Sequence, residues 1–105
     1  MAEQPKTSFR SFAEFYPYYL SEHQNRTSRR LHVVGTGLVI IFALWALFSG
    51  RGVLWLLVPL VGYGFAWVGH FFFEKNRPAT FRHPLYSLMG DFAMFRDVML
   101  GRLPF

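Results

Sequence analysis

Two long apolar runs dominate the hydrophobic pattern of this chain. The first, residues 31–48, reads LHVVGTGLVIIFALWALF, and the second, residues 53–73, reads VLWLLVPLVGYGFAWVGHFFF. A helix that rises about 1.5 Å per residue crosses a hydrocarbon core of about 30 Å with roughly 20 residues. We therefore predict membrane-spanning helices over residues 29–48 and 53–74.

The connector between the two runs is the short, glycine-rich sequence SGRG at residues 49–52. A connection of this length leaves the two helices as antiparallel neighbours. Trp45 and Trp55 lie near the connector, and aromatic side chains of this kind gather at membrane interfaces. The pattern thus predicts a helical hairpin. Its small residues also lead us to expect a homo-oligomer.

Amphipathic segments flank the hairpin on both sides. Ser11 and Glu14 have the spacing of a capping box, and they open a segment with aromatic residues at helical intervals. We predict interfacial helices over residues 8–25 and 84–100. The expected fold class is an all-α integral membrane protein, a two-span helical hairpin with an interfacial amphipathic helix at each end. Residues 1–105 form a single membrane domain in this interpretation.

The distribution of charge supports the same topology. The chain is 52% hydrophobic and 20% aromatic, with a net charge of +5. Ten of the eleven basic residues flank the hairpin, and they are Lys6, Arg10, Arg26, Arg29, Arg30, Lys75, Arg77, Arg82, Arg96 and Arg102. Only Arg51 lies in the connector. By the positive-inside rule both termini face the cytoplasm, so the basic residues predict a lipid bilayer and no nucleic acid as partner.

The residues that flank the two predicted spans also indicate the membrane in which the protein lies. The first thirty residues carry charges throughout and contain no apolar stretch typical of a cleavable signal peptide. Basic flanks of this kind fit a bacterial inner membrane or an endoplasmic reticulum membrane. The short chain favours the bacterial inner membrane.

Four histidines are the candidate chemistry of this chain, which has no cysteine. Without thiolates, any metal must be held by histidine, carboxylate, amide or water. His23 and His32 precede or open the first span, and His70 and His83 close or follow the second. A hairpin places all four at one membrane face. They either share a metal or serve separately as interfacial, hydrogen-bonded residues.

Polar neighbours of the histidines extend this hypothesis. Glu74 lies four residues after His70 on the same helical face, so its carboxylate either joins the metal or fixes the histidine tautomer. Asn25 either stops a helix or supports His23. Several imidazoles with a carboxylate and open positions suit non-haem Fe(II) and oxygen chemistry. Asp91 and Asp97 are expected to be solvated or paired with Arg96, without a chemical role.

Two sequence blocks carry a resemblance to a known family. The first, FYPYYLSEHQNRTSRRLHVVG over residues 15–35, has tyrosines, then His-x-Asn, then a histidine entering the first span. The second, GHFFFEKNRPA over residues 69–79, has Gly-His, a glutamate four residues later, and Pro-Ala. Together they resemble the family of small membrane proteins that includes the yeast 2-hydroxy fatty acid dioxygenase of phytosphingosine breakdown.

The resemblance implies an Fe(II)-dependent dioxygenase that uses O2 to shorten a 2-hydroxy fatty acid by one carbon. It implies His23, His32 and His70 as iron ligands, Glu74 as a ligand or supporting residue, and Asn25 as support. His83 is a further candidate ligand from its position alone. The alternative function is a non-enzymatic membrane hairpin that binds lipid or assembles a complex. The enzyme requires that the histidine rings converge on one point, whereas the scaffold does not.

Overall fold

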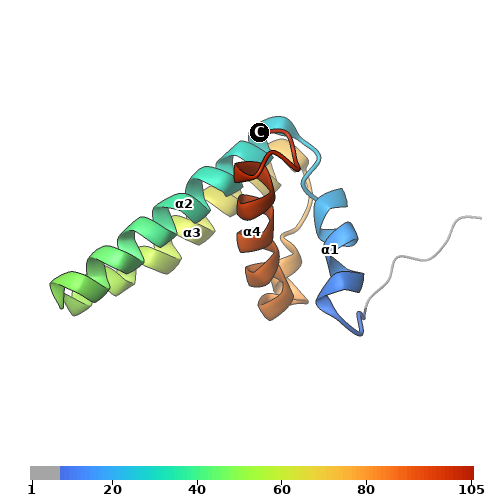
Figure 1. Cartoon of the computed structure of the whole chain (residues 1–105). Coiled ribbons are helices and arrows are strands. Elements are labelled where there is room, and N and C mark those ends of the chain that lie inside the picture. The colour runs from blue at the N-terminus through green and yellow to red at the C-terminus, as the bar shows by residue number, and fades with distance from the viewer. Residues whose placement is uncertain (1–7) are drawn as a thin grey trace, which may run out of the picture.

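The computed structural model describes residues 8–105, and this part of the chain is helical without a strand (Figure 1). Its elements in order are α1 (Phe12–Ser21), α2 (Arg26–Ser49), the 3₁₀ helix η1 (Gly52–Leu56), α3 (Leu57–Val68), the π-helix η2 (Gly69–Glu74), the 3₁₀ helix η3 (Ala79–Phe81) and α4 (Pro84–Met99).

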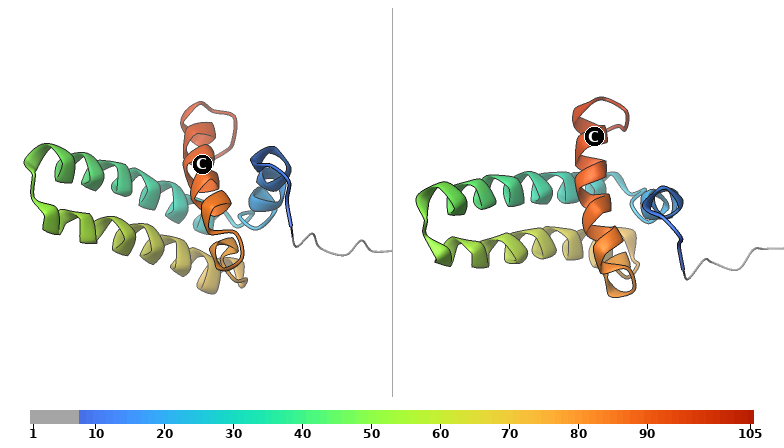
Figure 2. Two further views of the ribbon diagram at one scale, coloured as in Figure 1. Left: turned by 90° about the horizontal axis from the view of Figure 1, so that it is seen from below. Right: turned by 60° about the horizontal axis from the view of Figure 1, so that its bottom comes forward.

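The longest elements lie side by side as an antiparallel pair. Helix α2 forms one arm, and η1, α3 and η2 together form the other (Figure 2). Gly50 ends α2 with a φ of +70°, a left-handed conformation that glycine adopts without steric cost. Both arms are long and apolar enough to cross a membrane, and little of either is buried inside the protein. Membrane insertion and its orientation stay predictions.

The two arms approach closely along small residues. A Cβ atom on Gly35 of α2 would lie 2.7 Å from the Cβ of Phe65 in α3. Any larger side chain there would push the helices apart, because real Cβ contacts are never so short. The glycines therefore set the spacing of the pair, as small residues do in membrane helix pairs.

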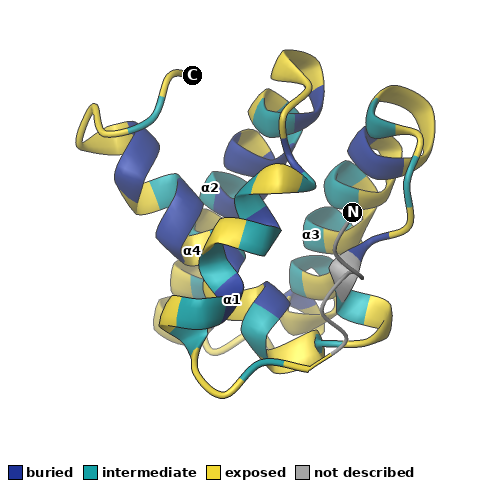
Figure 3. Ribbon diagram, turned by 90° about the vertical axis from the view of Figure 1, so that its right-hand side faces the viewer, coloured by how far each residue is buried: buried dark blue, intermediate teal, exposed yellow. Residues whose placement is uncertain are grey.

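Helices α1 and α4 pack together across the open end of the pair, and α4 crosses both arms (Figure 2). Their shared core contains Phe15 and Tyr19 of α1, Met94 and Val98 of α4, and Val33 of α2. Figure 3 shows this burial on α1 and α4, with exposed positions on their outer faces. The two flanking segments thus form one packed unit with the start of α2.

Helix α1 is shorter than the expected range of 8–25. It begins at Phe12 because the Ser11 hydroxyl accepts a hydrogen bond from the backbone N–H of Glu14 at 3.2 Å. It ends at Ser21, so His23 lies in the turn before α2. That turn lets His23 and the first turns of α2 face the same interior space.

Candidate metal centre

Three of the four histidines meet at the open end of the helix pair, where the turn before α2, the start of α2 and η2 come together. One ring nitrogen each of His23, His32 and His70 lies within 4.8 Å of the others. The Nε2 atoms of His23 and His32 are 3.1 Å apart. The centroid of the His70 ring lies 4.5 Å from that of His23 and 4.7 Å from that of His32. The three residues are only 1%, 3% and 2% exposed, so bulk water is excluded from the cluster.

The second nitrogen of each ring has an oxygen partner. Nδ1–H of His23 donates to the Tyr19 carbonyl oxygen at 2.6 Å, and Nδ1–H of His32 donates to the Ser28 carbonyl oxygen at 2.8 Å. Nδ1–H of His70 donates to the Asn76 side-chain oxygen at 2.7 Å. An acceptor at Nδ1 fixes the neutral tautomer in which Nε2 carries the lone pair, the form that binds metals.

The amide of Asn76 is held in the orientation that this tautomer needs. Its Nδ2 group donates to the Glu22 carbonyl oxygen at 3.2 Å and to the Glu22 carboxylate at 2.5 Å. The amide oxygen is therefore the atom left to face His70. Lys75, with a φ of 61°, reverses the chain after η2 and returns Asn76 to His70. The sequence patterns did not point to Asn76. The available signal was an asparagine two residues after the end of the helical run that carries His70.

Two of the expected site residues hold the backbone instead. Asn25 accepts a hydrogen bond from the Ser28 backbone N–H at 3.1 Å and so caps α2. The Glu74 carboxylate accepts the Asn25 backbone N–H at 2.5 Å, which ties the end of one arm to the start of the other. Among the described residues, Glu74 does not belong to the group that can hold a metal. Its expected place as a ligand is not supported by this geometry.

His83 lies apart from the other three histidines. It precedes the first residue of α4, and its ring packs against Phe9, Phe15 and Tyr18, with centroid distances of 5.1, 5.5 and 6.5 Å. The metal-binding group found among residues 8–105 excludes it. Its expected place as a ligand is therefore not supported, because a shared membrane depth does not fix the direction in which a side chain points.

Helix α4 supports the cluster through Tyr19. The Tyr19 ring stacks on the His23 ring with centroids 4.0 Å apart, and its hydroxyl donates to the Asp91 carboxylate. Gly90 makes room for this ring, since a Cβ there would lie 2.6 Å from it. The expectation that Asp91 is solvated or paired with Arg96 is wrong, because Arg96 bonds Asp97 and Asp91 faces the interior. Burial raises the pKa of Asp91 to about 6, although the hydrogen bond from Tyr19 has the opposite, smaller effect on this pKa.

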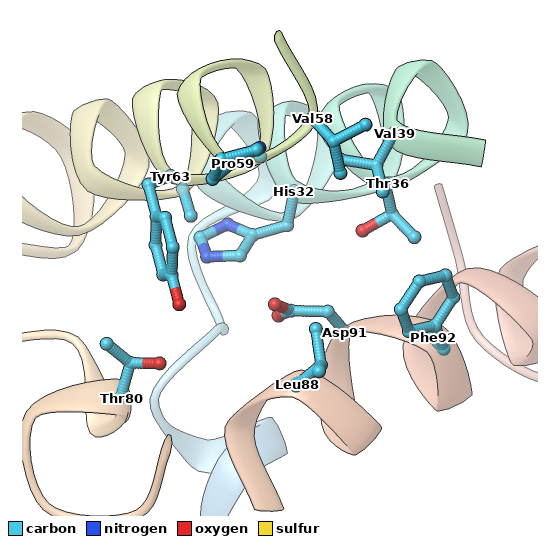
Figure 4. A pocket seen from close by; sticks show the side chains of 12 residues that line it. His32, Thr36, Val39, Val58, Pro59, Tyr63, Thr80, Leu88, Asp91 and Phe92 are labelled. Atoms are coloured by element: carbon cyan, nitrogen blue, oxygen red, sulfur yellow. The ribbon is translucent and has the colours of Figure 1, made fainter. Parts of the chain in front are cut away.

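Two adjoining cavities lead away from the cluster. The smaller, of about 20 Å³, is lined by all three histidines together with Ser87 and Asp91. The larger, of about 200 Å³, runs between α2, α3 and α4 and is mostly apolar (Figure 4). His32, Tyr63 and Asp91 line both cavities, so the two spaces meet there.

The donor set fits a divalent metal ion. Two nitrogen ligands of one ion, each at about 2.0–2.1 Å, lie roughly 3.0–3.4 Å apart, and the observed Nε2 separation of His23 and His32 is 3.1 Å. Two Nε2 lone pairs at this distance repel each other unless a cation lies between them. Burial, together with the charges that His32 and His70 would carry, lowers the pKa of His23 well below its ordinary value, which keeps that ring neutral.

Comparisons with known proteins give one family match for this chain. No curated protein and no solved structure matches the chain. A sequence model described as 2-hydroxy-palmitic acid dioxygenase Mpo1-like matches residues 9–103, which is nearly the whole chain and includes every residue of the cluster. The protein therefore belongs to the Mpo1-like family.

Proposed function

We propose that this protein is an Fe(II)-dependent dioxygenase that shortens 2-hydroxy fatty acids by one carbon at the cytoplasmic face of a membrane. The observation that carries the proposal is the set of three buried imidazoles, each with its Nδ1 bonded to an oxygen, so that Nε2 is the nitrogen left to bind a metal. A packing role requires no such common tautomer. The rings of His23, His32 and His70 turn toward one another, as the enzyme requires.

The ligand chemistry supports iron. Imidazole binds divalent first-row metals, and three protein ligands leave positions for other groups. Fe(II), when held by these residues, would bind the hydroxyl and carboxylate of the substrate and activate O2. The protein supplies the orientation of the rings and a water-excluded space.

The larger cavity supports an amphiphilic substrate. Its wall is built from side chains such as Val39, Val58 and Phe92, which suit an alkyl chain. The polar head of the same molecule would then lie against the histidines, at the end where His32 and Asp91 border both spaces. With the termini in the cytoplasm, this end lies at the cytoplasmic face, where a lipid keeps its tail among the apolar helices.

The proposed reaction balances without another reductant. A 2-hydroxy acid and one O2 give the acid one carbon shorter, CO2 and water. The bond between C1 and C2 breaks, and O2 accepts the four electrons that the substrate loses. The family description points to the same substrate class.

Oxygen uptake by purified protein tests this proposal. Iron-loaded protein in detergent should consume O2 when 2-hydroxypalmitic acid is added and should release the acid one carbon shorter, found by mass spectrometry. His70→Ala should abolish uptake, whereas His83→Ala, which removes a histidine outside the cluster, should keep it. Folded, iron-loaded wild type that consumes no O2 would instead favour the non-enzymatic hairpin that binds lipid or assembles a complex.

A further inference from the structure

Two polar side chains of α4 face the small cavity from the side opposite the imidazoles. Ser87 and Asp91 are four residues apart, so they lie one turn apart on one face of the helix. Both line the cavity that contains His23, His32 and His70. The proposed reaction requires a wall that recognises the polar head of the substrate, and the iron ligands alone do not provide one.

Ser87 has a buried hydroxyl without a partner. The residue is 4% exposed, and its Oγ atom forms no hydrogen bond within the described part of the protein. A buried hydroxyl left in this state is destabilising until a partner satisfies it. Ser28 also has an unpartnered Oγ, but it lines neither cavity. Ser87 is thus the unpartnered hydroxyl that a ligand in the cavity can reach.

Asp91 has one occupied carboxylate oxygen. Oδ1 accepts the Tyr19 hydroxyl, and within residues 8–105 no other hydrogen bond reaches this carboxylate. Figure 4 shows the carboxylate pointing from α4 into the larger cavity, toward α2 and α3. The remaining oxygen is an acceptor without a donor at the place where the two cavities meet.

The order of these groups matches the order of groups in a 2-hydroxy acid. Ser87 lines only the small cavity, Asp91 lines both, and Val39 and Val58 line only the large one. From head to tail, a 2-hydroxy acid presents its carboxylate, its hydroxyl and then its alkyl chain. Ser87 also lies near the N-terminal end of α4, where the helix dipole favours negative charge.

From this arrangement, and resting on the proposed function, we propose that Ser87 and Asp91 select the substrate. Ser87 donates a hydrogen bond to the carboxylate, and Asp91 accepts one from the 2-hydroxyl. The reverse arrangement would set two carboxylates against each other, which like-charge repulsion disfavours. Asp91 is then the residue that distinguishes a 2-hydroxy acid from the unsubstituted acid, since a site built to hydrogen-bond a hydroxyl rejects the analogue that lacks it.

Binding without turnover tests this assignment. Iron-loaded protein in detergent is titrated calorimetrically under anaerobic conditions, at about pH 8, with 2-hydroxypalmitic acid and with palmitic acid, which share one alkyl chain. Wild type should prefer the hydroxylated acid. Asp91→Leu should reduce that preference by about 10- to 100-fold, and Asp91→Asn, which still accepts from Tyr19, should reduce it less. Asp97→Asn, which alters the other carboxylate of α4 and lines neither cavity, is the matched control and should keep the preference.

Ser87→Ala separates recognition from structure. It should weaken the binding of both acids by about 10-fold, while the melting temperature of the ligand-free protein stays the same or rises, because no existing hydrogen bond is lost. If wild type does not prefer the hydroxylated acid, the substrate class in the proposed function is wrong. If wild type prefers it and the Asp91 and Ser87 variants behave like wild type, only the selection by α4 is overturned.

Discussion

At the scale of single residues, the tautomer of each imidazole is set by a different kind of acceptor. His23 and His32 each bond a backbone carbonyl four residues earlier, whereas His70 depends on the side chain of Asn76. The backbone carbonyls of Tyr19 and Ser28 are kept whatever side chain is substituted there, but the side-chain oxygen of Asn76 is lost on substitution. Asn76 is therefore the supporting residue that mutation can test.

We predict that Asn76→Ala lowers iron affinity by about 10- to 100-fold, the usual cost of losing a group that orients a metal-bound histidine. The measurement is iron retained per chain during dialysis against increasing chelator. Gln24→Ala is the control, because Gln24 is an exposed amide close to the cluster in sequence. Equal iron retention by Asn76→Ala and wild type would show that His70 does not need this partner.

Asp91 gives the fold a pH dependence. Its pKa in the folded protein is raised to about 6 from an ordinary 3.8, because burial penalises the charged form. The protonated form is thus favoured by folding, and the stability linked to it is fully present below about pH 4 and lost as the pH rises through about 6. We predict that metal-free Asp91→Asn, compared with wild type, gains about 1–3 kcal/mol between these pH values.

Thermal unfolding of both proteins at several pH values measures this difference. The two chains share all other titratable groups, so the contributions of those groups to the pH dependence cancel in the difference. A stability difference that stays constant from about pH 4 to about pH 8 would mean that Asp91 titrates normally in the folded protein.

The sequence predicted part of this site, for reasons that can be stated residue by residue. His23, His32 and His70 were found because a hairpin brings the ends of two spans together. His83 was added by the same reasoning, but depth alone does not determine direction, and the His83 ring packs among the aromatic residues of α1. Asn76 was missed because its approach depends on the left-handed turn at Lys75, which spacing does not reveal.

At the scale of elements, the site depends on how closely η2 approaches the start of α2. A Cβ on Gly69 would lie 2.7 Å from the Ser28 Oγ and 3.2 Å from the His32 ring. The π-helical turn places His70 directly after this contact, and such turns recur at functional sites. The helical pattern predicted the arm as a whole but not the π-turn, because one wider turn does not change the apolar periodicity enough to be read.

We predict that Gly69→Ala displaces the His32 ring and lowers iron content by at least about 10-fold, as loss of ligand geometry does. Gly64→Ala is the matched control on the same arm, since a Cβ there meets nothing within 4 Å. Iron per chain is measured in both variants after confirming equal helicity by circular dichroism. Full iron in Gly69→Ala would mean that the cluster tolerates a wider spacing.

At the scale of the whole molecule, the placement of the site follows from the hairpin. The connector at residues 50–51 lies at one end of the helix pair, whereas α1 and the C-terminus lie toward the other end (Figure 1). The backbone carbonyl of Phe105 accepts a hydrogen bond from Arg30 at 3.4 Å, so the C-terminus meets the start of α2. If the spans insert as the positive-inside rule predicts, the connector and the site face opposite sides of the membrane.

The absence of cysteine makes this topology measurable with single cysteines. We predict that Arg51→Cys reacts with a membrane-impermeant maleimide added to intact spheroplasts of an expressing bacterium. Arg102→Cys should react only after the membrane is permeabilised. The reverse pattern would place the site on the outer face, and labelling of both without permeabilisation would argue against insertion.

The proposed chemistry depends on an iron site made by three histidines. Its most direct measurement is iron per chain after anaerobic purification, for wild type and for His23→Ala, His32→Ala, His70→Ala and His83→Ala, each shown to be folded. We expect about one iron per chain in wild type and in His83→Ala, and loss of it in each of the other three variants. Full iron in any of those three, or none in folded wild type, would rule out an iron site made by these three histidines.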